Sequence, residues 1–178
     1  MKQDRARRTH ALILDAAATE FAAHGAVGGS IERVAQRIGL TKGALYGHFA
    51  SKGALMVDLL DQFDASWQEL LTRARQEPAS GLDAAGRLLD ELAERLGTDV
   101  RFACGLRLAT ERSRTEGRVP DQVERLRTVL VELATLAQED GELAAAAPAP
   151  RRGAATCGGG ARGGATNTPG PAAAPRGG

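Results

Sequence analysis

Residues 41–52 read Thr-Lys-Gly-Ala-Leu-Tyr-Gly-His-Phe-Ala-Ser-Lys. The hydroxyl of Thr41 can cap a helix, and the segment has room for about nine helical residues. Leu45 and Phe49 are its apolar anchors, whereas the remaining positions are small or polar. Hydrogen-bond donors stand at Lys42, Tyr46, His48 and Lys52. A helix that fills a core would carry more apolar side chains, so this pattern predicts a helix that presents one face to a partner.

Two helices are expected before this segment. Residues 8–24 carry apolar side chains at four-residue steps, and Gly25 is a natural stop. Ser30 can cap a second, shorter helix that ends at Gly39. Two short amphipathic helices joined by a tight glycine turn form a helix-turn-helix.

Further helical patterns continue down the chain. They cover residues 52–76, 82–96, 100–112 and 120–136. Pro78 stops the first of them, and breaks are expected at Gly97 and around Gly117. No segment before residue 144 alternates convincingly with the two-residue period of a strand. The predicted fold class is therefore all-α, with a helix-turn-helix domain over residues 1–52 and a helical regulatory domain over residues 53–143.

Charge is distributed unevenly, although the formal net charge is only +1. Residues 1–52 hold eight Lys or Arg against four Asp or Glu, residues 53–143 hold eleven against eighteen, and residues 144–178 hold four against none. The near-neutral total conceals a basic head, an acidic body and a basic tail. The isoelectric point therefore says little about partners.

No catalytic, metal or membrane site is indicated. Cys104 and Cys157 are far apart, and the three histidines lie in separate contexts, so no metal-ligand or disulfide spacing is present. The chain has no nucleophile elbow, and no strand precedes its glycine-rich stretches. It also lacks an apolar signal-peptide core and any run of about 18 apolar residues. We expect a soluble cytoplasmic protein that is not an enzyme and uses no cofactor.

The segment after the glycine turn has the chemistry of a helix that enters the major groove of DNA. Gly43 and Ala44 allow close approach, and Lys42 can reach a phosphate or a guanine edge. Tyr46 and His48 can donate to phosphate oxygens. The predicted DNA-binding residues are Ser30, Thr41, Lys42, Gly43, Ala44, Tyr46, His48 and Lys52, with positions 41–44 facing bases. Each alone is equally well explained as a solvated or half-buried side chain, but their joint occurrence favours DNA.

Residues 8–55 resemble the N-terminal domain of the tetracycline-repressor (TetR) family. The resemblance rests on Ile13-Leu14-Asp15-Ala16-Ala17, Ser30-Ile31, Val34-Ala35, Thr41-Lys42-Gly43-Ala44-Leu45-Tyr46, His48-Phe49 and Ser51-Lys52. It implies a homodimeric repressor that reads a palindromic double-stranded DNA operator and is released by a small molecule. The opening Lys2-Gln3-Asp4-Arg5-Ala6 with Arg8-Thr9 further resembles the γ-butyrolactone receptor branch. A γ-butyrolactone is therefore one candidate effector.

The resemblance also implies an effector cavity among the later helices. Its candidate lining is Phe63, Trp67, Leu88, Leu92, Phe102, Leu106, Leu126, Val129, Leu130 and Leu133. As helical apolar stripes, these residues are more readily explained as ordinary core. Arg107 and Glu111, four residues apart, can orient a ligand or form a surface ion pair, and the ion pair is favoured.

Two positions depart from the family pattern. Ala26 stands where an aromatic residue often follows the glycine, and Gly53 stands where an acidic helix former is common. Both changes are expected to loosen the small domain, and Gly53 costs up to about 1 kcal/mol relative to Ala. Neither touches a predicted DNA contact.

Residues 144–178 differ in kind from the rest. Thirty of these 35 residues are Ala, Gly, Pro or Arg, and none is Leu, Ile, Val, Met or aromatic. Without apolar side chains to bury, we expect a disordered tail. One hypothesis is a frameshifted C-terminus that replaces the family's dimerisation helices, and its rival is a basic linker that adds non-specific DNA affinity. If dimerisation is lost, the chain is instead a truncated helical module that pairs with a full-length relative and does not itself repress.

Overall fold

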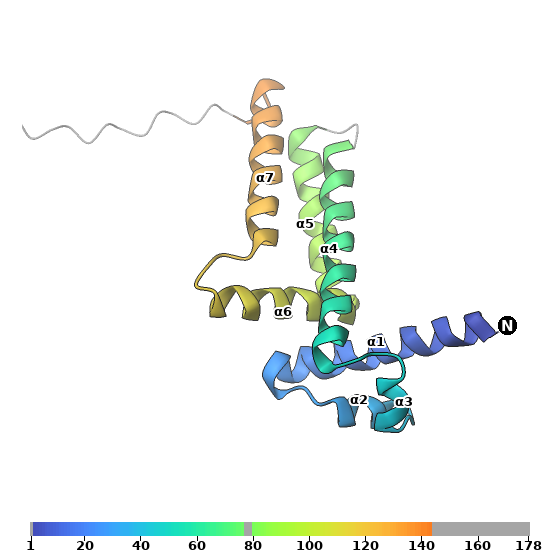
Figure 1. The fold of residues 1–178 in the computed structure, drawn as a ribbon. Helices are drawn as coiled ribbons and strands as arrows, with labels where there is room; N and C mark the ends of the chain where they lie inside the picture. Colours follow the sequence, from blue (N-terminus) through green and yellow to red (C-terminus); the bar gives the residue numbers. More distant parts are fainter. Residues whose placement is uncertain (1, 77–79, 144–178) are drawn as a thin grey trace, which may run out of the picture. The chain divides into compact units, whose positions relative to one another are not determined.

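The computed structural model describes residues 2–76 and 80–143, and every regular element in these ranges is an α-helix (Figure 1). The helices are α1 (Lys2–Gly28), α2 (Ile31–Arg37), α3 (Lys42–Tyr46), α4 (Lys52–Gln76), α5 (Gly81–Thr98), α6 (Val100–Thr115) and α7 (Asp121–Glu139). The all-α fold class is confirmed. The expectations for residues 144–178 and for Pro78 lie outside the described residues.

Capping side chains begin the helices where the sequence indicates. The Thr41 hydroxyl accepts the backbone N–H of Ala44 at 3.1 Å, and the Ser30 hydroxyl accepts that of Arg33 at 3.4 Å. Asp99 ends α5 and caps α6 through the backbone N–H of the second and third residues that follow it. Local sequence therefore explains the spacing of these helices.

Two helices run past their predicted glycine stops. Gly25, at a φ of +71°, kinks α1 but does not end it, and the helix resumes as far as Gly28. In α5 the predicted break at Gly97 is absent, because helical hydrogen bonding continues to Thr98. Glycine lowers the stability of a helix but does not by itself end one. Helix α1 therefore bends at Gly25, and α5 continues through Gly97.

The third helix is shorter than the predicted nine residues. It has five and ends at Tyr46. Gly47 then closes the last turn, and the backbone N–H groups of His48 and Phe49 both donate to the Leu45 carbonyl, at 2.9 and 3.0 Å. The predicted contact His48 therefore lies in a turn and not on the helix.

The first apolar cluster joins α1, α2, α3 and the start of α4 to α6, which lies alongside α1 in Figure 1. Phe21, Leu45 and Leu55 are completely buried in it, and Cys104 and Leu108 belong to the same cluster from α6. Packing therefore continues across residue 52, where the sequence predicts a domain boundary.

The second cluster fills the space among α4, α5, α6 and α7. Its centre is a group of three aromatic rings. The ring centroids are 5.5 Å apart for Phe63 and Trp67, 5.1 Å for Phe63 and Phe102, and 5.7 Å for Trp67 and Phe102. Gly105 permits the close approach of α6, since a Cβ there would lie 2.3 Å from Phe63. These aromatic contacts hold α6 across α4.

Candidate nucleic-acid interface

The third helix exposes the side that the sequence predicts for DNA. Lys42, Gly43, Ala44 and Tyr46 are all exposed, as is Thr41 at the N-cap. Leu45, in contrast, is completely buried and fixes the helix to the first apolar cluster. One anchor therefore leaves the opposite face available for contact with a groove.

Glu32, which the sequence analysis did not identify as functional, holds two predicted contact residues. The Lys42 ammonium forms an ion pair with Glu32, and the Ser30 hydroxyl donates to the Glu32 carboxylate at 2.8 Å. These bonds, first from Lys42 and then from Ser30, lower the pKa of Glu32 to about 2, and the bond from Lys42 raises the pKa of that lysine in turn. A carboxylate of the chain thus binds the hydroxyl of Ser30, one of the residues predicted to contact DNA.

Tyr46 and His48 both reach solvent next to basic groups. The Tyr46 side chain is 42% exposed, and the Lys42 ammonium lies 6.0 Å from its ring centroid. His48 lines an open cavity with Ala6, Arg7 and His10 of α1. The basic start of α1 and the turn after α3 therefore share one surface.

Lys52 differs from the other predicted contacts because its ammonium faces the protein. It donates to the carbonyl of Val27 at 3.2 Å and lies 5.8 Å from the centroid of the Phe21 ring. A cation at this position satisfies a carbonyl at the end of α1. A phosphate contact through Lys52 would require this bond to break.

An ion pair between the buried carboxylate of Glu20 and the half-exposed Arg33 fixes α2 against α1. The carboxylate of Glu20, which is 1% exposed, accepts the Arg33 Nε–H at 2.6 Å and the Ser30 backbone N–H at 3.1 Å. Burial acts to raise the pKa of Glu20, but the bonds from Arg33 and Ser30 outweigh it and lower the pKa. Since α3 follows α2 after a tight turn, this pair also helps to orient α3.

Polar contacts connect this unit to the rest of the chain. His10 Nε2 lies 2.8 Å from Asp58 Oδ2 on α4, and its ring stacks on Phe49 at 4.6 Å. On α6, Arg101 Nε donates to Asp15 Oδ1 at 2.7 Å. Both α4 and α6 therefore hold α1 through hydrogen bonds as well as apolar packing.

Arg107 and Glu111 form the favoured ion pair, with Nε and Oε1 2.8 Å apart, but they also bind the end of α1. Glu111 Oε2 accepts the backbone N–H of Ala26 at 2.8 Å, and Arg107 donates to the carbonyl of Ala22 at 2.5 Å. The bond from Ala26, followed by that from Arg107, lowers the pKa of Glu111. A Cβ on Gly25 would lie 2.5 Å from this carboxylate, so glycine is required at the kink.

The predicted effector lining lies in the second apolar cluster. Six of its members are buried, namely Phe63, Trp67, Leu88, Phe102, Val129 and Leu133. The other four, Leu92, Leu106, Leu126 and Leu130, are partly buried and pack against them. This packing agrees with the interpretation of these residues as core. The indole N–H of Trp67 is nevertheless buried without a hydrogen-bond partner among the described residues.

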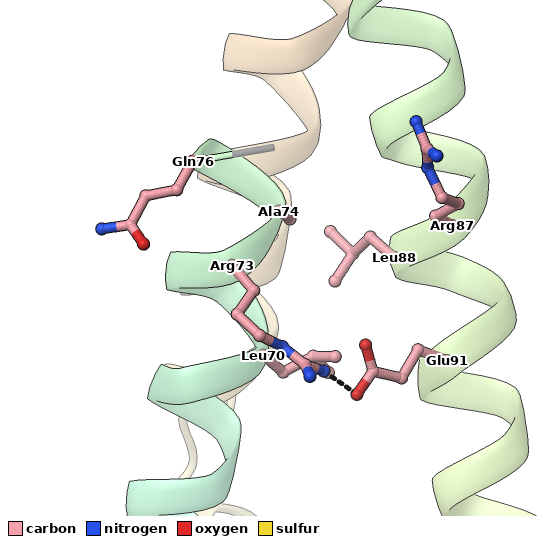
Figure 2. Close-up of a pocket in the computed structure, with 7 residues that line it drawn as sticks. All are labelled: Leu70, Arg73, Ala74, Gln76, Arg87, Leu88 and Glu91. Atoms are coloured by element: carbon pink, nitrogen blue, oxygen red, sulfur yellow. Dashed lines mark hydrogen bonds and ion pairs between the residues drawn. The ribbon is translucent and has the colours of Figure 1, made fainter. Parts of the chain in front are cut away.

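A groove of about 340 Å³ lies between α4 and α5. Figure 2 shows Leu88 pointing from α5 towards Ala74 and Leu70 of α4, and the ion pair between Arg73 and Glu91 crossing the space between the two helices. Leu88 is the one member of the predicted effector lining in this groove. The groove is therefore distinct from the aromatic cluster around Trp67.

Within residues 2–76 and 80–143, no group of three His, Cys, Asp or Glu side chains is placed to hold a metal ion. None of the helices in these ranges combines the length and the apolar character that a membrane span needs. The thiol of Cys104 is buried, and burial raises its pKa to about 12. It is therefore a packing residue and not a nucleophile at neutral pH.

Comparison with known proteins matches residues 13–59 to the family described as bacterial regulatory proteins, tetR family. The A-factor receptor protein of Streptomyces griseus is 44% identical over 61 residues, which are 34% of this chain and 22% of that protein. The transcriptional repressor KstR2 of Rhodococcus jostii is 37% identical over 82 residues, which are 46% of this chain and 38% of that protein. The matched regions thus span well under half the length of these relatives.

A solved structure extends the likeness beyond the helix-turn-helix. The crystal structure of a γ-butyrolactone receptor, an ArpA-like protein, is 26% identical, with a TM-score of 0.68. The alignment covers 80% of this chain and 74% of that one. These relatives are regulators and not enzymes, in agreement with the sequence analysis. The chain belongs to the TetR family of bacterial regulatory proteins, and within that family it resembles the γ-butyrolactone receptor branch.

Proposed function

We propose that the chain is a DNA-binding transcriptional repressor that reads a palindromic operator as a homodimer and is released by a small molecule. The exposed face of α3, fixed by the single buried anchor Leu45, carries the DNA-binding part of the proposal. The family match over residues 13–59 and the repressor among the relatives support it. Residues 1–52 are the proposed DNA-binding domain and residues 53–143 the proposed regulatory domain.

Within the DNA-binding domain the proposed contacts fall into two groups. Positions 41–44 face base edges, where small side chains let the backbone approach the groove. Ser30, Tyr46 and His48 donate to phosphates and set the register. Lys42 exchanges its partner Glu32 for DNA, while Lys52 makes the weakest contribution because it is held by Val27.

Selection from a random duplex library tests the operator proposal. The purified chain is incubated with the library, bound duplexes are amplified over several rounds, and the enriched sequences are read. We expect a palindrome whose half-sites lie about 34 Å apart or a multiple of that distance. Enrichment of a single half-site would contradict reading by a dimer, and no enrichment would contradict specific DNA binding.

The dimer is proposed to use the open face of α5. Leu82, Leu89 and Leu96 are 51, 47 and 37% exposed, and their seven-residue spacing places them along one line of the helix. We assign this line to a second copy of the chain. Pairing with a longer relative is the alternative function, and it is favoured if the chain is monomeric alone.

The effector is proposed to bind at the aromatic cluster of Phe63, Trp67 and Phe102. The unpartnered indole N–H of Trp67 supports this, because a lactone carbonyl is a suitable acceptor for a buried donor. Trp67 is the only tryptophan, so its fluorescence reports on this position. We expect saturable quenching by a γ-butyrolactone. No change in emission would contradict this effector site and leave the DNA-binding proposal intact.

A further inference from the structure

An apolar cavity of about 390 Å³ lies at the junction of α1, α4 and α6. Its walls include Ala26 and Val27 at the end of α1, Gly53, Met56 and Val57 at the start of α4, and Leu108 of α6. We call it the junction cavity. Its volume lies in the range of about 300–1,000 Å³ typical of small-molecule sites. It is separate from the aromatic cluster around Trp67, whose residues do not line it.

Two small residues keep the junction cavity open. Ala26 offers only a methyl group, and Gly53 offers no side chain at all. A Cβ at Gly53 would meet only the hydroxyl of Ser51, at 3.5 Å, so packing does not demand glycine there. The same two positions depart from the family pattern. Both of these positions therefore line the same cavity, although they are 27 positions apart in sequence.

The charged groups at the wall already have partners within the chain. The carboxylate of Glu111 is bound by Arg107 and by the backbone N–H of Ala26, each at 2.8 Å. Arg112 Nε lies 3.1 Å from Glu116 Oε1. A ligand with a net charge would meet no free countercharge and would lose hydration on entry. The cavity therefore suits an uncharged, largely apolar molecule.

We infer that the junction cavity is a binding site for a neutral, apolar small molecule, distinct from the effector site proposed at Trp67. An apolar cavity of about 150 Å³ is enough to bind benzene, so the junction cavity has room for a molecule of several rings or a branched chain. Such a ligand touches α1, α4 and α6 together. It thereby stiffens the joint through which Glu111 and Arg107 hold the end of α1.

The effect of this ligand on DNA binding rests on the proposed function, whereas the binding of the ligand to the chain does not. Occupancy limits the movement of α1 relative to α4 and so shifts the chain towards one spacing of the two α3 helices in a dimer. The binding measurement is therefore made without DNA. A chain that fails to bind DNA duplexes can still bind the ligand. Failure of the proposed function and failure of this inference are therefore distinguishable.

Met56 gives the binding test a direct reporter. The chain contains only two methionines, Met1 and Met56, so methyl-labelled methionine gives two signals in a carbon-edited NMR spectrum. The probe is N-phenyl-1-naphthylamine, which is neutral and apolar. We expect titration to move the Met56 methyl signal saturably and leave the Met1 signal in place. An unmoved Met56 signal at saturating probe would overturn the inference.

A cavity-filling variant and a matched control identify the site. Gly53→Leu places a side chain in the junction cavity, and we expect it to weaken probe binding at least tenfold. Gly86→Leu adds the same side chain on α5, where a Cβ meets nothing within 4 Å, and should bind as the parent does. Equal affinity in all three proteins would overturn the inference. A Met56 signal that shifts with protein concentration alone would also do so, because a second copy then fills the cavity.

Discussion

At the scale of single residues, Glu32 forms an ion pair with Lys42, which we propose as a DNA contact. Its carboxylate binds Lys42 and Ser30 at the same time, so two proposed DNA contacts are satisfied within the free protein. A phosphate that approaches this surface must displace an anion already in place. DNA binding at this proposed surface would therefore replace one anion with another, and we expect its strength to depend on the charge of Glu32.

Glu32→Gln is predicted to tighten DNA binding by about three- to tenfold, because Lys42 loses its internal ion pair and like-charge repulsion with phosphate falls. Fluorescence anisotropy with a selected duplex measures the change. Glu124→Gln, which removes an equally exposed carboxylate from α7, is the control and should bind as the parent does. Weaker binding by Glu32→Gln would show that the carboxylate orders the interface and does not block it.

The lowered pKa of Glu20 predicts that the stability of the folded chain depends on pH. Its pKa is lowered in the folded chain from an ordinary value of 4.5, so the unfolded state binds more protons once the pH falls below about 4.5. The stabilisation is present above that pH and is lost as the pH falls through the folded value. We expect Glu20→Gln to be about 2 kcal/mol less stable at pH 7 and to lose less stability in acid. Urea unfolding from pH 7 to pH 3 tests this, and parallel curves would contradict it.

At the scale of helices, local signals account for most of the architecture. Ser30 and Thr41 cap α2 and α3 as their positions in the sequence indicate, and Gly39 turns between them at a φ of +68°. The length of α3 was not predictable in the same way. Its apolar spacing from Leu45 to Phe49 suits a helix, but the His48 N–H bonds to the Leu45 carbonyl three residues back, which tightens the last turn.

Two glycines at element ends are predicted to respond to alanine in opposite directions. Gly53 lies in the first turn of α4 with no need for a positive φ, so Gly53→Ala should raise stability by up to about 1 kcal/mol. Gly39 has a φ of +68° and nothing within 4 Å of an added Cβ, so Gly39→Ala should lower it by roughly 1 kcal/mol through the backbone alone. Thermal unfolding of both variants measures whether each substitution raises or lowers stability. Shifts in the same direction would refute the backbone argument.

At the scale of the whole molecule, the contacts that hold α1 come from distant sequence. Arg101 reaches Asp15 across 86 positions, and Glu111 reaches the backbone of Ala26 across 85. Sequence spacing predicts the ion pair of Arg107 and Glu111. No local sequence signal predicts that the same pair also binds the backbone at the end of α1. Periodicity identifies which residues share a helix face, and only tertiary packing decides which helix that face meets.

The open line of leucines on α5 predicts how the chain self-associates. Leu89→Glu places a charge at the centre of this line, so we expect the dimer to weaken by at least tenfold while the monomer stays folded. Sedimentation velocity over a concentration series measures the change. Val119→Glu, at a residue 54% exposed before α7, is the control. A parent chain that is monomeric at every concentration would favour the alternative of pairing with a longer relative.

The exposed face of α3 is proposed to bind DNA, and Lys42→Ala tests this proposal most directly. Fluorescence anisotropy with a selected duplex is measured over a series of salt concentrations for the parent, Lys42→Ala and Arg127→Ala, which removes an exposed cation from α7. We predict that Lys42→Ala weakens binding about tenfold and reduces the slope of log affinity against log salt by about one, while Arg127→Ala changes neither. Parent-like affinity and slope in Lys42→Ala would contradict the assignment of α3 as the DNA-reading helix.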